Sequence, residues 1–186
     1  MKVIDTEIEG VKIIEPKIFE DERGYFLESY NNLNFINNID YVDFVQDNES
    51  KSSYGVMRGL HFQRQPHTQA KLVRCVRGAV LDVAVDLRKG SPTYGKHVAV
   101  ELTENNHRQL FIPKGFAHGF SVLSDTAVFQ YKCDDFYHPE LDGGINILDE
   151  SLEIEWKIPT EKAILSEKDT KHPMLKDFDS PFKYKE

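Results

Sequence analysis

Short stretches in which apolar and polar residues alternate constrain the fold of this chain more than any other feature. Between residues 78 and 87 every odd position is apolar, while Asp82 and Asp86 occupy even positions. Similar stretches follow at residues 96–103, 109–112, 120–123 and 127–132. Because the side chains of a β-strand point alternately to its two faces, each stretch predicts a strand.

Turn-forming residues separate these predicted strands. They stand at residues 90–92 (Gly-Ser-Pro), 105–106 (Asn-Asn) and 113–115 (Pro-Lys-Gly). No long helical period lies between them, so the pattern favours an antiparallel sandwich or barrel of the jelly-roll kind. Short helices are expected at residues 31–39 and within 166–176. Since the 186 residues contain no internal repeat or linker, we expect one all-β domain, 1–186, with a few short helices.

The composition is typical of a folded globular protein. Hydrophobic residues make up 40% of the chain and aromatic residues 11%. The first residues lack the apolar run of a signal peptide, and no stretch approaches the length of a membrane span. Cys75 and Cys133 are too few for a disulfide framework and are expected to be reduced thiols. We therefore expect a cytoplasmic protein without membrane contacts.

Residues 51–81 form a cationic segment in an acidic chain. They hold six lysines and arginines and no carboxylate, although the formal net charge of the protein is -8. Such a concentration of positive charge suits a small anionic ligand, while the acidic remainder disfavours nucleic acid. The chain has neither a G-x-G-x-x-G motif nor a complete P-loop motif, G-x-x-x-x-G-K followed by Ser or Thr, so a phosphate ligand would be held by side-chain cations.

The imidazole of His61 lies among these charges, two residues after Gly59. A packed strand histidine is the ordinary interpretation, but the small neighbour and the nearby cations favour a functional role. A metal site is the other alternative. It is disfavoured because Gln63 stands where a second histidine ligand is wanted, no glutamate follows until Glu101, and Lys71 repels cations. We expect no metal.

Residues 56–63, with the sequence VMRGLHFQ, resemble the signature of the dTDP-4-dehydrorhamnose 3,5-epimerase family, the RmlC-type cupins. Further matching segments occur in family order at residues 21–26, 45–48, 70–74, 83–88, 112–120 and 165–169. The resemblance covers nearly the whole chain. It implies a metal-free homodimer with the jelly-roll fold of a cupin, a double-stranded β-helix. It also implies inversion of C3 and C5 of a 4-keto-6-deoxy sugar linked to dTDP, without a cofactor.

The resemblance assigns acid–base chemistry to four residues. His61 corresponds to the base that removes protons α to the C4 ketone, and Asp169 to the carboxylate that orients it. Lys71 corresponds to the cation that stabilises the enolate, and Tyr131 to the proton donor on the opposite face. Taken alone, Asp169 also fits a capping box that begins at Ser166. Likewise, Tyr131 fits an inward-facing core aromatic, and Lys71 a solvated strand lysine.

The resemblance also implies a set of ligand contacts. The residues that match family positions near the diphosphate and sugar are Arg23, Glu28, Gln46, Asn48, Arg58, His118 and Lys168. Arg23 is implied to reach the ligand of the neighbouring subunit, and Tyr137 to stack on thymine. Asp142 stands where a glutamate is expected in many relatives, so its contact with the base is left open.

Two other functions stay open on the sequence. A relative that inverts only C3 or only C5, or that acts on another 4-keto nucleotide sugar, would carry the same acid–base residues. A non-catalytic cupin that binds nucleotide sugars is expected to have lost them, yet all four are present. The sequence therefore favours the 3,5-epimerase.

Overall fold

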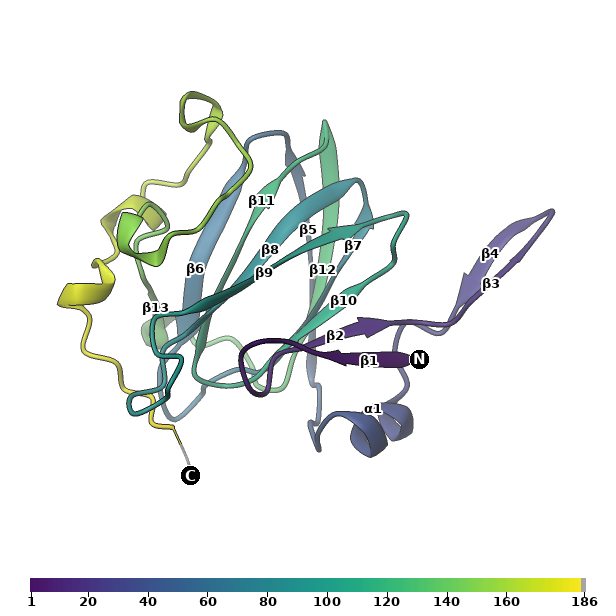
Figure 1. Ribbon diagram of the computed structural model, residues 1–186, viewed down its shortest axis with the longest axis horizontal. Coiled ribbons are helices and arrows are strands. Elements are labelled where there is room, and N and C mark those ends of the chain that lie inside the picture. The colour runs from purple at the N-terminus through teal and green to yellow at the C-terminus, as the bar shows by residue number, and fades with distance from the viewer. Residues whose placement is uncertain (185–186) are drawn as a thin grey trace.

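Two antiparallel β-sheets packed face to face form the body of the protein (Figure 1). The computed structural model describes residues 1–184. In spatial order, the six-stranded sheet consists of β1 (Lys2–Asp5), β2 (Lys12–Glu15), β10 (Gln109–Ile112), β7 (Lys71–Arg77), β12 (Thr126–Cys133) and β5 (Gln46–Ser53). The five-stranded sheet consists of β13 (Asp142–Gly144), β6 (Met57–Gln63), β11 (Phe116–Val122), β8 (Ala79–Asp86) and β9 (His97–Thr103). The predicted all-β sandwich is confirmed.

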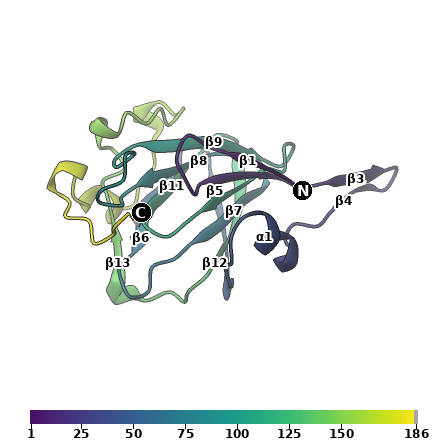
Figure 2. The same ribbon diagram turned by 60° about the horizontal axis from the view of Figure 1, so that its bottom comes forward.

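A hairpin stands away from the two sheets. Its strands, β3 (Ile18–Asp21) and β4 (Gly24–Leu27), pair with each other. The hairpin projects from the body in two different views (Figures 1 and 2). Most of its side chains are exposed, although the Tyr25 ring lies against that of His107, with centroids 4.7 Å apart.

The predicted strands and the first predicted helix are present, with shifted ends. Strands β8, β9, β10 and β12 coincide closely with the stretches of alternating residues, while β11 begins at Phe116, ahead of the predicted residue 120. Helix α1 (Asn32–Asn38) lies within the predicted range 31–39, and the Asn31 side chain caps its first turn. In place of an α-helix within 166–176, the structure has two 3-10 helices: η4 (Asp169–Lys171), and η5 (Leu175–Asp177), which ends one residue beyond that range. Pro173 lies between them and interrupts a helix at this point.

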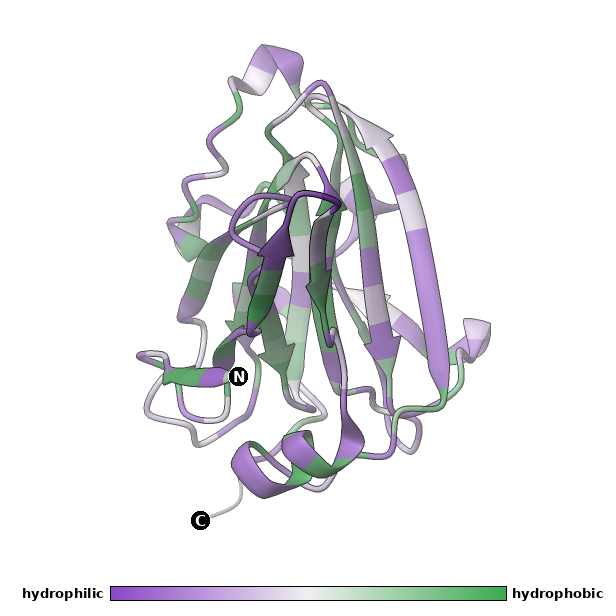
Figure 3. Cartoon of the chain, turned by 90° about the vertical axis from the view of Figure 1, so that its right-hand side faces the viewer, coloured by the Kyte–Doolittle hydropathy of each residue, from purple (hydrophilic) through white to green (hydrophobic). Residues whose placement is uncertain are grey.

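The alternation in β8 reflects two buried faces rather than one buried and one exposed face. Val80 and Ala84 lie in the core between the sheets, whereas Leu81 and Val83 lie in a second core under the C-terminal segment. Hydrophilic and hydrophobic bands alternate along the strands in Figure 3. Asp82 shares the inner face and is 0% exposed. A carboxylate buried in this way must find a partner inside the protein.

The C-terminal segment, residues 139–184, adds β13 to the five-stranded sheet and covers the outer face of that sheet, on the left of Figure 1. Ile145, Ile147 and Leu152 pack there with Leu60 and Phe62 of β6. Three further 3-10 helices interrupt this part of the chain: η1 (Pro139–Leu141), η2 (Glu150–Leu152) and η3 (Thr160–Lys162). Between residues 1 and 184, no helix has the length and apolar character needed to cross a membrane.

Candidate active site

A cleft of about 530 Å³ opens between strands of the two sheets. Strands β6 and β11 of one sheet and β5, β7 and β12 of the other contribute to its walls, together with residues 164–169 of the C-terminal segment. The predicted site residues that line it are Asn48, Arg58, His61, Lys71, His118, Tyr131, Lys168 and Asp169. The fold therefore brings all four predicted acid–base residues into one space.

An irregularity in β6 places Arg58 and His61 in the same cleft. Residues three apart on a regular strand point to opposite faces of the sheet. The register between β6 and β11 shifts at this point, as in a β-bulge. Gly59 has a φ of +136°, and a Cβ atom there would lie 2.5 Å from the Cα of Gly119. Glycine is therefore required for the close approach of the two strands beside the cleft.

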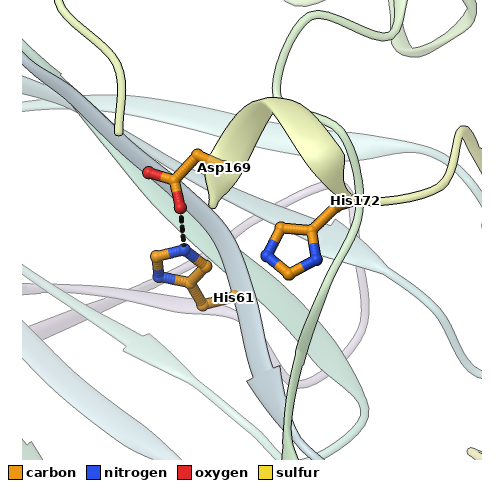
Figure 4. A group of neighbouring side chains, drawn as sticks. All are labelled: His61, Asp169 and His172. Atoms are coloured by element: carbon orange, nitrogen blue, oxygen red, sulfur yellow. Dashed lines mark hydrogen bonds and ion pairs between the residues drawn. The ribbon is translucent and has the colours of Figure 1, made fainter. Parts of the chain in front are cut away.

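His61 is paired with Asp169, the first residue of η4 (Figure 4). The distance from His61 Nε2 to Asp169 Oδ1 is 2.6 Å, and Asp169 is 3% exposed. Burial raises the pKa of the Asp169 carboxyl, but the hydrogen bond and charge of His61, together with hydrogen bonds from Ser166 and the Gly59 backbone, hold that pKa below its ordinary value. The ionised carboxylate fixes the proton on Nε2, which leaves Nδ1 of His61 as the basic nitrogen. Ser166 Oγ also accepts from the Asp169 backbone N–H (3.2 Å), so half of the alternative capping box is present.

Lys71 and Tyr131 line the cleft from the sheet opposite His61. The Lys71 Nζ lies 5.8 Å from the centre of the Tyr131 ring. Burial lowers the pKa of Lys71 and raises the pKa of Tyr131, because a charged form is disfavoured away from water. The Tyr131 hydroxyl therefore stays protonated at neutral pH. A Lys71 cation in so poorly hydrated a place interacts strongly with any oxyanion that forms beside it.

His118 lies beside His61, as its partner across β11 and β6. Its Nε2 lies 2.8 Å from Asp82 Oδ2, and burial lowers the pKa of the His118 imidazole. The second oxygen, Asp82 Oδ1, is buried and has no hydrogen-bond partner within residues 1–184. Asp82 is one of the two fully buried carboxylates of β8, and its partner is thus the histidine in the cleft wall.

Comparison with known proteins identifies the family. The family model described as dTDP-4-dehydrorhamnose 3,5-epimerase matches residues 5–177. The chain belongs to this epimerase family. It is 57% identical over 170 residues to the dTDP-4-dehydrorhamnose 3,5-epimerase of Escherichia coli K12, with 91% of each chain covered. It is 54% identical over 180 residues to that of Shigella flexneri, covering 96% of this chain and 98% of the relative.

A solved epimerase structure aligns with this chain over its whole length. It is the dTDP-6-deoxy-D-glucose-3,5-epimerase of Legionella pneumophila in complex with dTDP-4-keto-L-rhamnose. The identity is 49% and the TM-score 0.95, with 100% of this chain and 99% of that chain covered. The fold is therefore the cupin-type jelly roll of the epimerase family, as predicted.

Several residues that the epimerase resemblance assigned to the nucleotide form a connected group at the rim. Lys168 is ion-paired with Asp142, whose Oδ2 also accepts from the Tyr137 hydroxyl at 3.1 Å. Gln46 accepts from the Tyr137 backbone N–H at 3.0 Å, and its amide donates to Asn48 at 3.1 Å. Two members of this group, Lys168 and Asn48, line the cleft itself. The bonds therefore connect the residues predicted to hold the base with the cleft.

Two other residues of the epimerase pattern, Arg23 and Glu28, do not line the cleft of their own chain. Arg23 lies at the turn of the projecting β3–β4 hairpin (Figure 1) and is ion-paired with Asp21. Glu28 accepts hydrogen bonds from the side chains of Asn31 and Asn34, next to α1. Contact of either residue with a ligand in this cleft would need a second protomer or a movement of the segment.

His172 is a neighbour of the His61–Asp169 pair that the sequence did not indicate (Figure 4). The His172 and His61 rings are 5.9 Å apart between centroids, at an angle of 71°. His172 Nε2 is buried without a hydrogen-bond partner in the described part of the chain, and burial lowers the pKa of this imidazole. A Cβ at Gly144 would lie 2.6 Å from that nitrogen, so the glycine provides the space for the ring. A single histidine in a polar segment carries no periodic or motif signal.

Proposed function

We propose that the protein inverts C3 and C5 of dTDP-4-dehydro-6-deoxy-D-glucose and so forms dTDP-4-dehydro-L-rhamnose. One observation carries this proposal: the His61–Asp169 pair lies on one wall of the cleft, and Tyr131 and Lys71 lie on the other. Inversion requires a base and an acid on opposite sides, because the proton leaves one face of the sugar ring and returns to the other. Family membership and the similarity to a structure with bound dTDP-4-keto-L-rhamnose support the same substrate.

The chemistry follows from the ketone at C4. Both C3 and C5 are adjacent to it, so loss of a proton from either carbon gives an enolate. His61 Nδ1 takes this proton, since Nε2 is engaged by Asp169, and Lys71 stabilises the negative oxygen. Tyr131 then donates its hydroxyl proton to the opposite face of the ring. Each inversion leaves a protonated His61 and a Tyr131 phenolate, and proton exchange with water restores both before the second inversion.

The rim residues supply the rest of the proposed site. Arg58 and Lys168 are the cations placed to hold the diphosphate, since both line the cleft beside the acid–base residues. Gln46, Asn48 and His118 are proposed to contact the diphosphate and the sugar. Tyr137 is proposed to stack on thymine, with Asp142 beside it as a partner of its hydroxyl. This mechanism uses no metal or other cofactor.

A homodimer completes the proposed site. In it, the β3–β4 hairpin of one protomer brings Arg23, and with it Glu28, towards the partner's cleft. The exposed apolar side chains of the hairpin support this arrangement: Phe19, Tyr25 and Phe26 are 52%, 56% and 69% exposed. Apolar groups gathered on a projecting segment mark an interaction surface.

The remaining parts of the proposal concern domain organisation and compartment. Residues 1–186 are proposed to be a single epimerase domain, since one family model spans residues 5–177. A cytoplasmic location is proposed because Cys75 and Cys133 are both free thiols, which suits a reducing compartment.

Isotope exchange tests the reaction. In heavy water and without added metal, the purified protein is expected to introduce deuterium at C3 and at C5 of dTDP-4-dehydro-6-deoxy-D-glucose, detected by proton NMR. Label at one carbon only would identify an enzyme that inverts a single centre. Absence of label with folded protein would exclude both enzyme functions and favour a cupin that only binds nucleotide sugars.

Mixed dimers test the role of Arg23 across subunits. Arg23→Ala and His61→Asn chains, each defective alone, are co-expressed with different tags. If Arg23 acts in the partner's cleft, one site of each mixed dimer is complete, and random pairing restores about a quarter of wild-type activity. The matched control pairs His61→Asn with Lys71→Met, which lie in the same cleft and leave no complete site. No recovery in the first mixture would place Arg23 outside the partner's site.

A further inference from the structure

His67, Asp135 and His138 form a second cluster of metal-binding side chains. None of them lines the cleft around His61. One nitrogen or carboxylate oxygen from each lies within 4.8 Å of the other two. His67 Nδ1 is 3.0 Å from Asp135 Oδ2, and His138 Nδ1 is 3.3 Å from Glu140 Oε1. Two imidazoles and one carboxylate thus meet at one place, and Glu140 lies next to His138.

We propose that this cluster binds a divalent transition metal ion such as Zn²⁺, with His67, Asp135 and His138 as its protein ligands. Imidazole nitrogens and carboxylate oxygens are donors that such ions accept. Bonds of about 2.0–2.2 Å to a tetrahedral Zn²⁺ separate two ligand atoms by roughly 3.4 Å. The distance of 3.0 Å between His67 Nδ1 and Asp135 Oδ2 is already close to this separation.

A single buried side chain holds the segments that carry these ligands. Gln63 is 3% exposed, and its amide donates to the backbone carbonyls of His67 (3.1 Å) and Phe136 (3.0 Å). Its carbonyl oxygen accepts from the backbone N–H of His138 at 2.5 Å. The two loops that contribute the ligands are therefore fixed relative to each other, as the support of a metal site requires.

The imidazole rings themselves must turn when the ion binds. The His67 and His138 rings are stacked, with centroids 3.8 Å apart and an angle of 18° between their planes. Since the lone pair of an imidazole lies in the ring plane, one ion cannot lie in the planes of two parallel rings. The two side chains are 37% and 31% exposed, so water can surround a ring that rotates out of the stack. Binding of the ion is therefore expected to open the stack.

The local charge favours a cation at this cluster. Asp135 belongs to the cluster, Glu140 lies 3.3 Å from His138, and Asp134 is next to Asp135 in sequence. Lys114 is paired with Asp134 at 2.9 Å, which leaves the Asp135 carboxylate for the ion. A positive ion thus enters a negatively charged part of the surface.

The only comparable group among the described residues, His61, Asp169 and His172, offers the opposite environment. It also has three ligand atoms within 4.8 Å of one another. However, Arg58 and Lys71 line the same cleft, and their charges repel a divalent cation. The two groups therefore differ in charge more than in geometry, and the ion is expected at the surface cluster.

Metal titration tests the site. Untagged full-length protein, freed of metal by a chelator, is titrated with Co²⁺, whose visible bands report four-coordinate binding, and then with Zn²⁺ in competition. One ion per chain is expected. The double variant His67→Gln/His138→Gln is expected to bind at least about tenfold more weakly, since loss of an outer-shell partner alone costs 10–100-fold in affinity. His97→Gln, on β9 at the far edge of the five-stranded sheet, is the matched control and should bind like the wild type.

Thermal denaturation and the variant His172→Gln distinguish binding at the surface cluster from binding at His61, Asp169 and His172. Zn²⁺ is expected to raise the melting temperature of the wild type and of His97→Gln, but not that of the double variant. Circular dichroism without metal checks that every variant is folded. Equal Co²⁺ affinity of the wild type and the double variant would overturn the proposal. So would binding that is lost in His172→Gln and kept in the double variant, because the ion would then lie at the cleft.

Discussion

His61→Asn is expected to lower kcat for epimerisation by about 10²–10⁴-fold, the usual contribution of a general base. Asparagine keeps a polar side chain next to Asp169 but has no basic nitrogen to accept a proton. Because Asp169 engages Nε2 of His61, the group removed by the substitution is the free Nδ1 that faces the cleft. The measurement is the rate of deuterium incorporation at C3 and C5 in heavy water.

Binding of dTDP distinguishes loss of chemistry from loss of structure. Calorimetry should give a similar Kd for dTDP in the wild type and in His61→Asn, because the proposed nucleotide contacts lie on other residues. His97→Gln, a histidine on β9 outside the cleft, should exchange hydrogen at the wild-type rate. If His61→Asn binds dTDP and still exchanges at the wild-type rate, another group is the base.

The sheets of this protein are largely predictable from its sequence, because strand periodicity is a local property. The stretches at 78–87 and 96–103 became β8 and β9, which pair with each other, β9 at the edge of the sheet. Which face of β8 is polar did not follow from the pattern. Asp82 points to the interior because the C-terminal segment covers the other face, and this covering is a long-range feature.

The cationic segment 51–81 marks the site only in part. Of its six cations, Arg58 and Lys71 line the cleft. Arg74 instead bonds to Gln130 at 2.9 Å, and Arg77 is exposed. Charge along a sequence cannot assign side chains to one face when a strand is irregular, and the irregularity at Gly59 is what directs Arg58 into the cleft.

The His61–Asp169 pair could not be derived from spacing at all. The two residues are 108 positions apart, and Asp169 lies in a 3-10 helix of the C-terminal segment. Local reasoning about Asp169 leads to a capping box, and the structure contains half of it. At the level of sequence, only the resemblance to a family connected the two residues. The fold supplies the physical reason for their contact: the C-terminal segment packs against β6 and so brings Asp169 to His61.

Lys71→Met is expected to lower kcat by about 10²–10³-fold, as loss of one oxyanion-stabilising group does. The same substitution should leave the melting temperature unchanged or raise it at neutral pH. Burial lowers the pKa of Lys71, so the folded state holds the ammonium at a cost in free energy that a methionine of similar length does not have. Deuterium exchange and thermal denaturation together provide the measurement.

The pH dependence of this stability difference has a definite sign. A lowered pKa in the folded state means that the unfolded chain binds the proton more tightly. The free-energy cost of holding the Lys71 ammonium in the folded protein is therefore fully present below the folded-state pKa. As the pH rises towards 10.5, the ordinary pKa of lysine, the unfolded chain also loses its proton and the cost disappears. The melting-temperature gain of Lys71→Met over the wild type should therefore shrink at high pH.

Lys132→Met on β12 is the control, since Lys132 is paired with Asp47 at 2.9 Å outside the cleft. It should change neither activity nor this pH dependence. Wild-type exchange in Lys71→Met would remove this lysine from the mechanism, because no other change in the cleft accompanies the loss of its charge.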